Sequence, residues 1–176
     1  LYIMNSRFRT LFTSVMTLLS LLLLATTSNA NNLKGMDIIT EEYPPYNFKS
    51  KGKSVEGIAV DLLIEAAKTQ GESLTSGDIA LRPWARGYRS AQTGPKVILF
   101  STTKTDERTP LFKWAGPITA TRVVLMAKKS KGIKIMGGAD LSKYKVGAIR
   151  DDVGEQLVKA LNKGIKVKST ANATAM

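Results

Sequence analysis

The sequence contains no Cys and no His among its 176 residues. The absence of Cys excludes disulfide scaffolds, Cys-based zinc sites and thiol nucleophiles. The absence of His excludes Ser-His-Asp triads and His-ligated metals. Most common catalytic chemistries are therefore unavailable, and what remains is carboxylate, Lys or Tyr chemistry, or a protein that performs no chemistry. We expect a non-enzyme without a cofactor or a metal site.

Acidic residues are also scarce. The sequence has 14 Asp and Glu but 26 Lys and Arg, which gives a net charge of +12. The hydrophobic content of 43% is that of a globular protein. The basic residues are dispersed, apart from a modest cluster at Lys128, Lys129, Lys131 and Lys134, and no recognition helix accompanies them. We therefore expect no nucleic-acid partner. Interaction with an anionic cell surface is a better explanation of the positive charge.

One long hydrophobic run is present, and it lies within the first thirty residues. Arg7 and Arg9 precede an apolar stretch at residues 11–25, and small residues follow up to Ala30. This pattern is typical of a secretory signal peptide (residues 1–30), cleaved after Ala30. The alternative is a permanent anchor, which requires about 20 apolar residues, more than this stretch offers. We predict an exported protein, and without Cys near the cleavage point a lipoprotein anchor is excluded.

Alternating strand and helix patterns follow and predict an α/β fold. Strands are predicted at residues 36–40, 78–81, 97–100, 144–149 and 166–169, helices at 58–70, 84–91 and 152–163, and extended segments at 112–118 and 122–127. Residues 49–54 are predicted as a basic turn and 128–138 as a surface excursion. This order predicts a parallel sheet covered by helices.

The two longer helices each show a candidate apolar face. The first face comprises Ala59, Leu62, Leu63, Ala66 and Ala67, and the second comprises Val153, Leu157, Val158 and Leu161. We expect these faces to be buried.

Ligands of parallel sheets bind beyond the carboxyl ends of the strands. Three loops follow predicted strands, at residues 41–46, 82–84 and 101–108. In the third loop Thr105 can cap a helical turn, which leaves backbone amides and the hydroxyls of Ser101 and Thr103 facing the cleft. The guanidinium of Arg108 can grip a carboxylate through charge-assisted hydrogen bonds of about 1.5–3 kcal/mol each. The alternative is a capped turn whose Arg108 pairs with Asp106 on the surface.

Other residues of these loops have two interpretations each. Tyr43, Tyr46 and Trp84 can stack on a ligand or close the edge of the core. Glu41 and Glu42 can hold a ligand cation or remain solvated. The acids that begin the last helix (Asp151, Asp152 and Glu155) need no metal to explain them.

Six segments in this order resemble a known family. They are residues 41–48 (EEYPPYNF), 57–62 (GIAVDL), 83–86 (PWAR), 100–108 (FSTTKTDER), 112–118 (FKWAGPI) and 146–154 (VGAIRDDVG). Together they resemble the periplasmic solute-binding proteins of ABC importers, in the polar amino-acid branch (extracellular solute-binding protein family 3). The resemblance covers nearly all of the chain after residue 30.

The resemblance implies a periplasmic-binding-protein-like fold of type II, with two α/β lobes joined by a hinge. Lobe 1 would span residues 31–121 and a partial lobe 2 residues 122–176. Arg108 would bind the ligand α-carboxylate, helped by Thr103 and Ser101. Tyr43 would stack over the ligand, and Trp84 would begin the helix that lines the cleft.

The second-lobe loop departs from the family pattern, in which small hydroxyl residues meet the ligand carboxylate. Here it contains Arg150, Asp151 and Asp152. Acids at this place would repel a carboxylate, and Arg150 would compensate. We retain Arg150 and Asp152 as ligand-binding candidates, together with Glu42.

The implied function is a monomeric periplasmic receptor that closes around an amino acid or related carboxylate and delivers it to an ABC permease in the inner membrane. One alternative is an enzyme on the same fold, a dehydratase or a lytic-enzyme-associated domain, with Glu41 and Glu42 as the best-placed acids. The other is a ligand-sensing module of a receptor. Family members continue beyond the point where this sequence ends, so we expect either a fragment or a truncated gene product. We expect it to bind ligand poorly or not at all, since closure needs both lobes.

Overall fold

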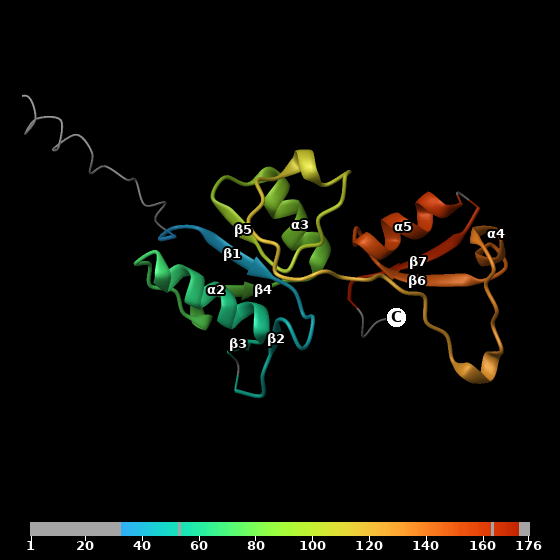
Figure 1. Cartoon of the computed structure of the whole chain (residues 1–176), viewed down its shortest axis with the longest axis horizontal. Helices are drawn as coiled ribbons and strands as arrows, with labels where there is room; N and C mark the ends of the chain where they lie inside the picture. Colours follow the sequence, from blue (N-terminus) through green and yellow to red (C-terminus); the bar gives the residue numbers. More distant parts are fainter. Residues whose placement is uncertain (1–32, 53, 163, 173–176) are drawn as a thin grey trace, which may run out of the picture. The chain divides into compact units, whose positions relative to one another are not determined.

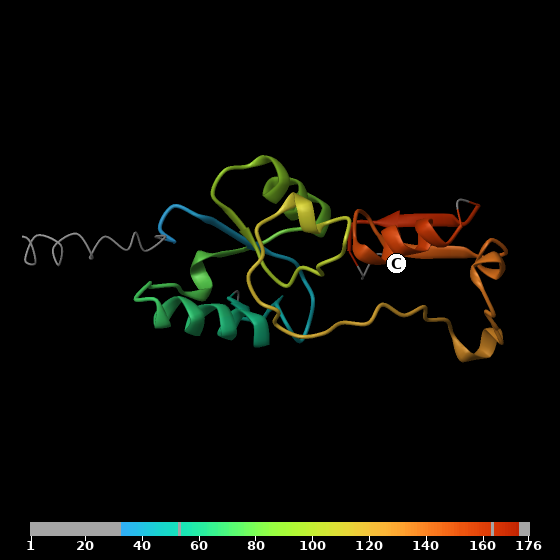
Figure 2. The same ribbon diagram turned by 45° about the horizontal axis from the view of Figure 1, so that its top comes forward.

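The computed structural model describes residues 33–52, 54–162 and 164–172, so the predicted signal peptide lies outside the described residues. Two parallel sheets, each accompanied by helices, follow one another along the chain (Figures 1 and 2). This arrangement confirms the α/β class that the alternating patterns predict.

The first sheet has three strands in the order β4-β1-β5. β1 spans Asp37–Thr40, β4 spans Ile79–Leu81 and β5 spans Val97–Leu99. Both pairings with β1 are parallel, with Ile38 opposite Ile79 on one side and Ile98 on the other. All three strands were predicted within one residue of their observed ends, and β5 ends one residue before the predicted Phe100.

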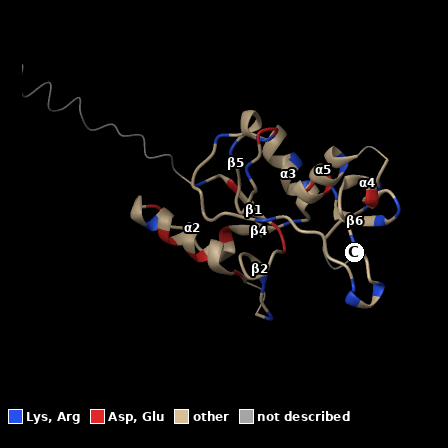
Figure 3. Ribbon diagram, turned by 45° about the vertical axis from the view of Figure 1, so that its right-hand side comes forward, with Lys and Arg blue, Asp and Glu red and all other residues tan. Residues whose placement is uncertain are grey.

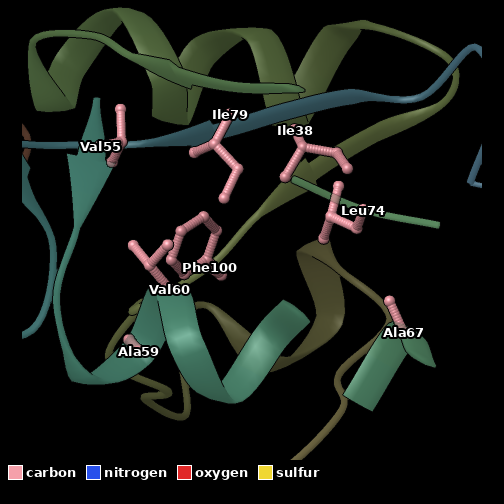
Figure 4. Close-up of a cluster of buried hydrophobic side chains, with 8 residues drawn as sticks. All are labelled: Ile38, Val55, Ala59, Val60, Ala67, Leu74, Ile79 and Phe100. Atoms are coloured by element: carbon pink, nitrogen blue, oxygen red, sulfur yellow. The ribbon is translucent and has the colours of Figure 1, made fainter. Parts of the chain in front are cut away.

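Helices cover both faces of this sheet. α2 (Ile58–Thr69) packs on the face that carries Ile38, where Val60 and Phe100 lie in the same buried cluster (Figure 4). α3 (Trp84–Thr93) packs on the other face, because a Cβ added to Gly87 would lie 3.1 Å from Cγ2 of Ile39. Neighbouring residues of β1 are therefore buried on opposite sides, as expected of a parallel strand covered on both faces.

A short hairpin that the sequence did not reveal precedes α2. β2 (Phe48–Lys49) pairs antiparallel with β3 (Val55–Glu56) around the predicted basic turn. The strands have two residues each, which is too short for a periodic pattern. Gly57 follows with φ 129° and caps α2.

We expect Gly57→Ala to reduce the free energy of unfolding by about 3 kcal/mol, because its Cβ would overlap the carbonyl oxygen of Tyr46 and its φ of 129° disfavours side chains. Gly71→Ala is the matched control, since Gly71 has φ 74° but no heavy atom within 4 Å of an added Cβ. The control should cost about 1 kcal/mol. Urea denaturation of both variants measures the difference, and equal costs would contradict the overlap.

The second sheet is a parallel pair of strands. β6 (Lys145–Ile149) pairs with β7 (Lys166–Thr170) through the crossover helix α5 (Val153–Leu161). All three were predicted. Its small core comprises Leu141, Val158 and Ile165. The turn of helix α4 (Gly138–Leu141) was not predicted.

The predicted apolar faces of the helices are partly wrong. In α2 the buried residues are Ala59, Val60 and Ala67, whereas Leu62 is 48% exposed. Apolar residues surround much of this helix, so periodicity alone could not select the face. In α5 Leu157 and Leu161 are exposed and Glu155 is buried, because its carboxylate has hydrogen-bond partners described below.

The remaining elements of the described residues are three short 3-10 helices, η2 (Ser76–Asp78), η3 (Thr109–Leu111) and η4 (Lys129–Lys131). Residues 113–128 have no regular structure, so the predicted extended segments do not join either sheet. Within the described ranges no helix is long and apolar enough to cross a bilayer.

Candidate functional site

The candidate site lies where the strands of the first sheet end. Glu41 follows β1, Ser101 lies two residues after β5, and Trp84 begins α3 after β4. Parallel pairing places these strand ends at one edge, as the sequence predicts. Arg82 also lies at this edge, but its guanidinium forms an ion pair with Asp37 at 2.9 Å and does not join the site.

Arg108 is the most buried charged side chain of the described residues, with an exposed fraction of 1%. Its Nη1 donates to the carbonyl of Thr103 at 3.2 Å and its Nη2 to the carbonyl of Asp151 at 3.1 Å. Its guanidinium carbon lies 5.2 Å from the ring centre of Trp84 and 5.0 Å from that of Tyr88. The alternative of a surface Arg108 paired with Asp106 is therefore wrong.

Local sequence explains why Arg108 is held in this position. The hydroxyl of Thr105 accepts the Arg108 backbone N–H at 3.2 Å, which confirms the predicted capped turn. Trp84 and Tyr88 lie four residues apart on α3, so they share one face of the helix and stack at 5.3 Å. The guanidinium packs against this aromatic pair, which stabilises a buried cation.

Asp151, in the loop between β6 and α5, contacts the same guanidinium through its main chain. Its carbonyl accepts from Trp84 Nε1 at 2.9 Å as well as from Arg108 Nη2. Its φ of 60° is left-handed, an uncommon conformation for a residue other than Gly. Its backbone N–H donates to Glu155 Oε2 at 2.8 Å, which ties the loop to α5.

Glu155 supports this loop from the first turn of α5. Its side chain accepts from Ser169 on β7 and pairs with Lys159 at 3.0 Å. Burial raises the pKa of Glu155, but the hydrogen bonds from Ser169 and the Asp151 N–H, with Lys159, outweigh it and hold the pKa below its ordinary value. The carboxylate therefore stabilises the fold above its unfolded pKa, and this stabilisation is lost as the pH falls.

We expect Glu155→Gln to lower the free energy of unfolding by about 2 kcal/mol at pH 7, because an amide replaces an acceptor of charge-assisted hydrogen bonds. The variant should also lose less stability than the wild type when the pH falls from 5 to 3. Glu65→Gln, at an exposed ion pair with Lys68, is the control and should change stability by less than about 0.5 kcal/mol. Denaturant titrations measure both effects, and an equally stable Glu155 variant would contradict this role.

Two polar atoms at the site are buried without a hydrogen-bond partner among the described residues, Ser101 Oγ and Arg108 Nε. Ser101 also has a left-handed φ of 60°. Buried polar groups are normally paired, and unpaired ones mark strained or functional positions. Both atoms can donate a hydrogen bond to an anion, and a carboxylate has the acceptor geometry that suits a guanidinium.

Glu41 places an acidic group near this cation. Its pKa is raised to about 7, mainly by burial and also by the charge of Asp152, while the charge of Arg108 opposes both. Asp152 itself caps α5, where its Oδ2 accepts the Gly154 N–H at 3.5 Å. A buried cation and two acids together can accommodate a ligand that carries both a carboxylate and an amino group.

The structure does not bring every predicted site residue together. Tyr43 is 50% exposed and stacks on Tyr46 at 5.6 Å. The carboxylate of Glu42 accepts the backbone N–H of Lys49 at 3.3 Å. Arg150 is exposed, and its side chain has no partner in the described part of the chain. Thr103 contributes its carbonyl oxygen to Arg108, not its hydroxyl.

Sequence reasoning missed Tyr88, the Asp151 carbonyl and the buried Glu155. The spacing of Tyr88 from Trp84 could have revealed the first, but the other two depend on backbone geometry.

An open hollow beside α2, lined by Tyr46, Ile58, Leu62 and Ile118 among others, contains none of the groups around Arg108. In the described part of the chain no cluster of three or more acidic side chains could hold a metal ion.

Comparison with known proteins gives a family match over most of the chain. The model of the bacterial extracellular solute-binding proteins, family 3, matches residues 36–173. No curated protein matches the chain.

Solved structures with the same fold were also found. An ancestral arginine-binding protein bound to glutamine is 25% identical, with a TM-score of 0.60, and the match covers 80% of this chain and 62% of that protein. The substrate-binding protein AbpA of an amino acid ABC transporter from Streptococcus pneumoniae, bound to L-arginine, is 24% identical, with a TM-score of 0.64 and coverage of 81% and 61%. The ancestral amino acid-binding protein AncCDT-1, a precursor of cyclohexadienyl dehydratase, is 24% identical, with a TM-score of 0.66 and coverage of 81% and 64%. The chain thus spans less than two thirds of the length of each of these proteins.

Proposed function

The chain belongs to the bacterial extracellular solute-binding proteins of family 3, and we propose that it captures a small amino-acid-type solute at Arg108. The family and the solved structures support a solute-binding role on an incomplete two-lobe fold of the periplasmic-binding-protein type. The observation that carries the proposal is the Arg108 guanidinium, which is 1% exposed, packs on two aromatic rings and retains an unpaired Nε.

In this proposal the ligand carboxylate accepts from Arg108 Nε and Ser101 Oγ. The ligand amino group lies near Glu41 and Asp152, which supply negative charge. Nη2 remains on the Asp151 carbonyl, so one guanidinium links the ligand to the loop after β6. Contacts from both sheets to one ligand are what favour a closed form over an open one.

The family places the protein outside the cytoplasm, in the periplasm or the extracellular space. We further propose a periplasmic location, with a signal peptide that is cleaved after Ala30. The two lobes would span residues 31–121 and 122–176. The protein would act as a monomer that delivers its ligand to an ABC permease. Tyr43, Glu42 and Arg150 remain proposed ligand contacts that would depend on movement of their loops. AbpA, which is described as a transporter component, supports the permease proposal.

The enzyme alternative is not favoured, because the family and most of the matched structures are binding proteins. AncCDT-1 is itself described as an amino acid-binding protein, although it is a precursor of a dehydratase. No observation in the described residues favours a receptor module.

The chain offers a sensitive test of binding, because it has two Trp residues and one of them donates its indole N–H at the site. Amino acids are titrated into the ¹⁵N-labelled chain, and the two indole N–H signals are followed by NMR, which detects weak binding. We expect a saturable shift of the Trp84 signal with at least one amino acid, and little shift of Trp114. Sodium acetate serves as the control titration. If no amino acid shifts the Trp84 indole signal more than sodium acetate does, the proposed function is wrong.

A further inference from the structure

The second half of the chain carries positive charge that its own acidic residues do not balance. Residues 109–150 contain nine Lys and Arg residues but only one acidic residue, Asp140. The carboxylate of Asp140 is already occupied, because it pairs with Lys143 Nζ at 2.8 Å and accepts the Met136 N–H at 3.0 Å. The other lysines of this stretch therefore have no carboxylate within it to neutralise them.

Two unbalanced lysines lie side by side at the start of the second sheet. β6 begins with Lys145 and β7 with Lys166, the two are partners in the parallel register, and both are exposed. Neighbouring strands lie about 4.8 Å apart, and like charges directly opposite each other destabilise a sheet. Neither lysine forms an ion pair within the described ranges. Asp151 contacts Arg108 from beyond the other end of β6, so the pair lies at the end away from the candidate site.

The η4 turn adds more lysines close to this pair. Its exposed lysines are Lys128, Lys129, Lys131 and Lys134. The N–H of Lys131 donates to the carbonyl of Lys128 at 2.9 Å, so the turn is shaped by its own main chain. α4 follows the turn, and three residues separate α4 from β6. Figure 3 shows the Lys and Arg colour on this turn and beside α4. We refer to these four lysines, together with the pair that begins the two strands, as the basic end.

We propose that the basic end docks on an anionic phospholipid surface. Lysine clusters of this size attract anionic lipid headgroups. The charge here is spread over a turn and two strand starts, which suits a broad charged surface better than a single bound ion. The family is extracellular, so its members meet membrane surfaces rather than cytoplasmic nucleic acid. Docking by the end away from Arg108 leaves the candidate site open to solute. The inference does not rest on the proposed function, because it uses no group of the candidate site.

Vesicle flotation of the full chain tests the proposal, with vesicles of phosphatidylcholine and about 30% phosphatidylglycerol as the probe. We expect the partition coefficient to exceed that on pure phosphatidylcholine vesicles at least about tenfold at low salt, and to fall as salt is added, because exposed charges are screened. Equal partitioning into both kinds of vesicle would overturn the proposal. Poly-glutamate probes for an acidic polypeptide as the partner, and binding to it without binding to the anionic vesicles would also overturn the proposal.

A variant of the η4 turn should lower partitioning into the anionic vesicles at least about tenfold. It carries the substitutions Lys128→Gln, Lys129→Gln, Lys131→Gln and Lys134→Gln. The matched control removes the same net charge from exposed lysines elsewhere, through Lys49→Gln, Lys51→Gln, Lys96→Gln and Lys113→Gln. The control should lower partitioning less than about threefold. Both variants keep the apolar stretch at residues 11–25, so its contribution to binding is common to both.

A second variant, Lys145→Gln with Lys166→Gln, tests the strand starts. It should also weaken binding to the anionic vesicles, and it should be at least as stable as the wild type, because two like charges are removed from opposite positions. Circular dichroism checks that all three variants are folded, which we expect because every substituted side chain is exposed. If the η4 variant and its control bind equally well, the overall charge rather than the basic end drives association, and the proposal is overturned.

Discussion

Arg108→Ala should abolish the ligand-induced shift of the Trp84 indole signal and lower the free energy of unfolding by about 3 kcal/mol. The first effect is expected because the guanidinium is the buried cation of the site and supplies the proposed donor to the carboxylate. The second follows because the substitution leaves the carbonyl of Thr103 without its donor and removes one of the two donors to the carbonyl of Asp151, and an unpaired buried acceptor costs about 1–3 kcal/mol.

A destabilised variant could lose binding simply by unfolding, so a second variant separates the two effects. Arg108→Lys retains the charge but loses the planar fork, and one ammonium cannot reach two carbonyls and a ligand in the same geometry. We expect Arg108→Lys to remain folded in circular dichroism at 10 °C and to bind at least about tenfold more weakly, the equivalent of about 1.4 kcal/mol.

Arg89→Ala is the matched control for both variants, because Arg89 lies on α3 near the site in sequence but is exposed. Its effect on stability should stay within about 0.5 kcal/mol, and its Trp84 signal should respond to ligand as in the wild type. If Arg108→Ala binds as well as Arg89→Ala, the carboxylate site lies elsewhere on the molecule.

The fold was largely predictable because its main elements carry strong local signals. The apolar runs before residue 41 and before residue 101, and the helix between residues 58 and 70, follow ordinary periodicity. Because the strands are parallel, their carboxyl ends lie at one edge of the sheet, and this can be predicted without knowing any contact between them. The predictions failed where the sequence pattern was too short or did not single out one face. The strands of the hairpin β2–β3 have two residues each, and α2 has more than one apolar face.

The site was predictable in its side chains but not in its main chain. Arg108, Thr105 and Trp84 were identified from residue type and position after a strand. The Asp151 carbonyl was not, because every residue has one and only the left-handed φ of 60° directs this one to Trp84 and Arg108. The acids of the loop after β6 were expected to repel a carboxylate, yet the group that contacts Arg108 there is a backbone oxygen.

Glu41 should make the protein less stable as the pH rises, which is the reverse of the usual behaviour of a paired carboxyl group. Its pKa is raised from 4.5 to about 7 in the fold, so the folded state binds more protons than the unfolded state between these values. Stability therefore falls as the pH rises through this window. We expect the free energy of unfolding to fall by about 2 kcal/mol between pH 5 and pH 8 through this group.

Glu41→Gln keeps the shape of the side chain and cannot ionise, so the variant should lack this decrease and be more stable than the wild type at pH 8. The charges that act on Glu41 are those of Asp152 and Arg108. Urea denaturation at pH 5, 6, 7 and 8 measures the difference between wild type and variant. Glu42→Gln is the matched control, since the neighbouring side chain is exposed, and its stability should follow the wild-type curve.

The same group links ligand binding to pH. An amino group placed near Glu41 favours the ionised carboxylate and lowers its pKa, so binding near pH 7 should release a proton. NMR titration of Trp84 should then show tighter binding at pH 8 than at pH 6 in the wild type and equal binding in Glu41→Gln. Calorimetry in buffers of different ionisation enthalpy would detect the released proton directly. Affinity that is independent of pH in the wild type would mean that the ligand amino group lies away from Glu41. Only the proposed contact of the ligand carboxylate with Arg108 would then be retained.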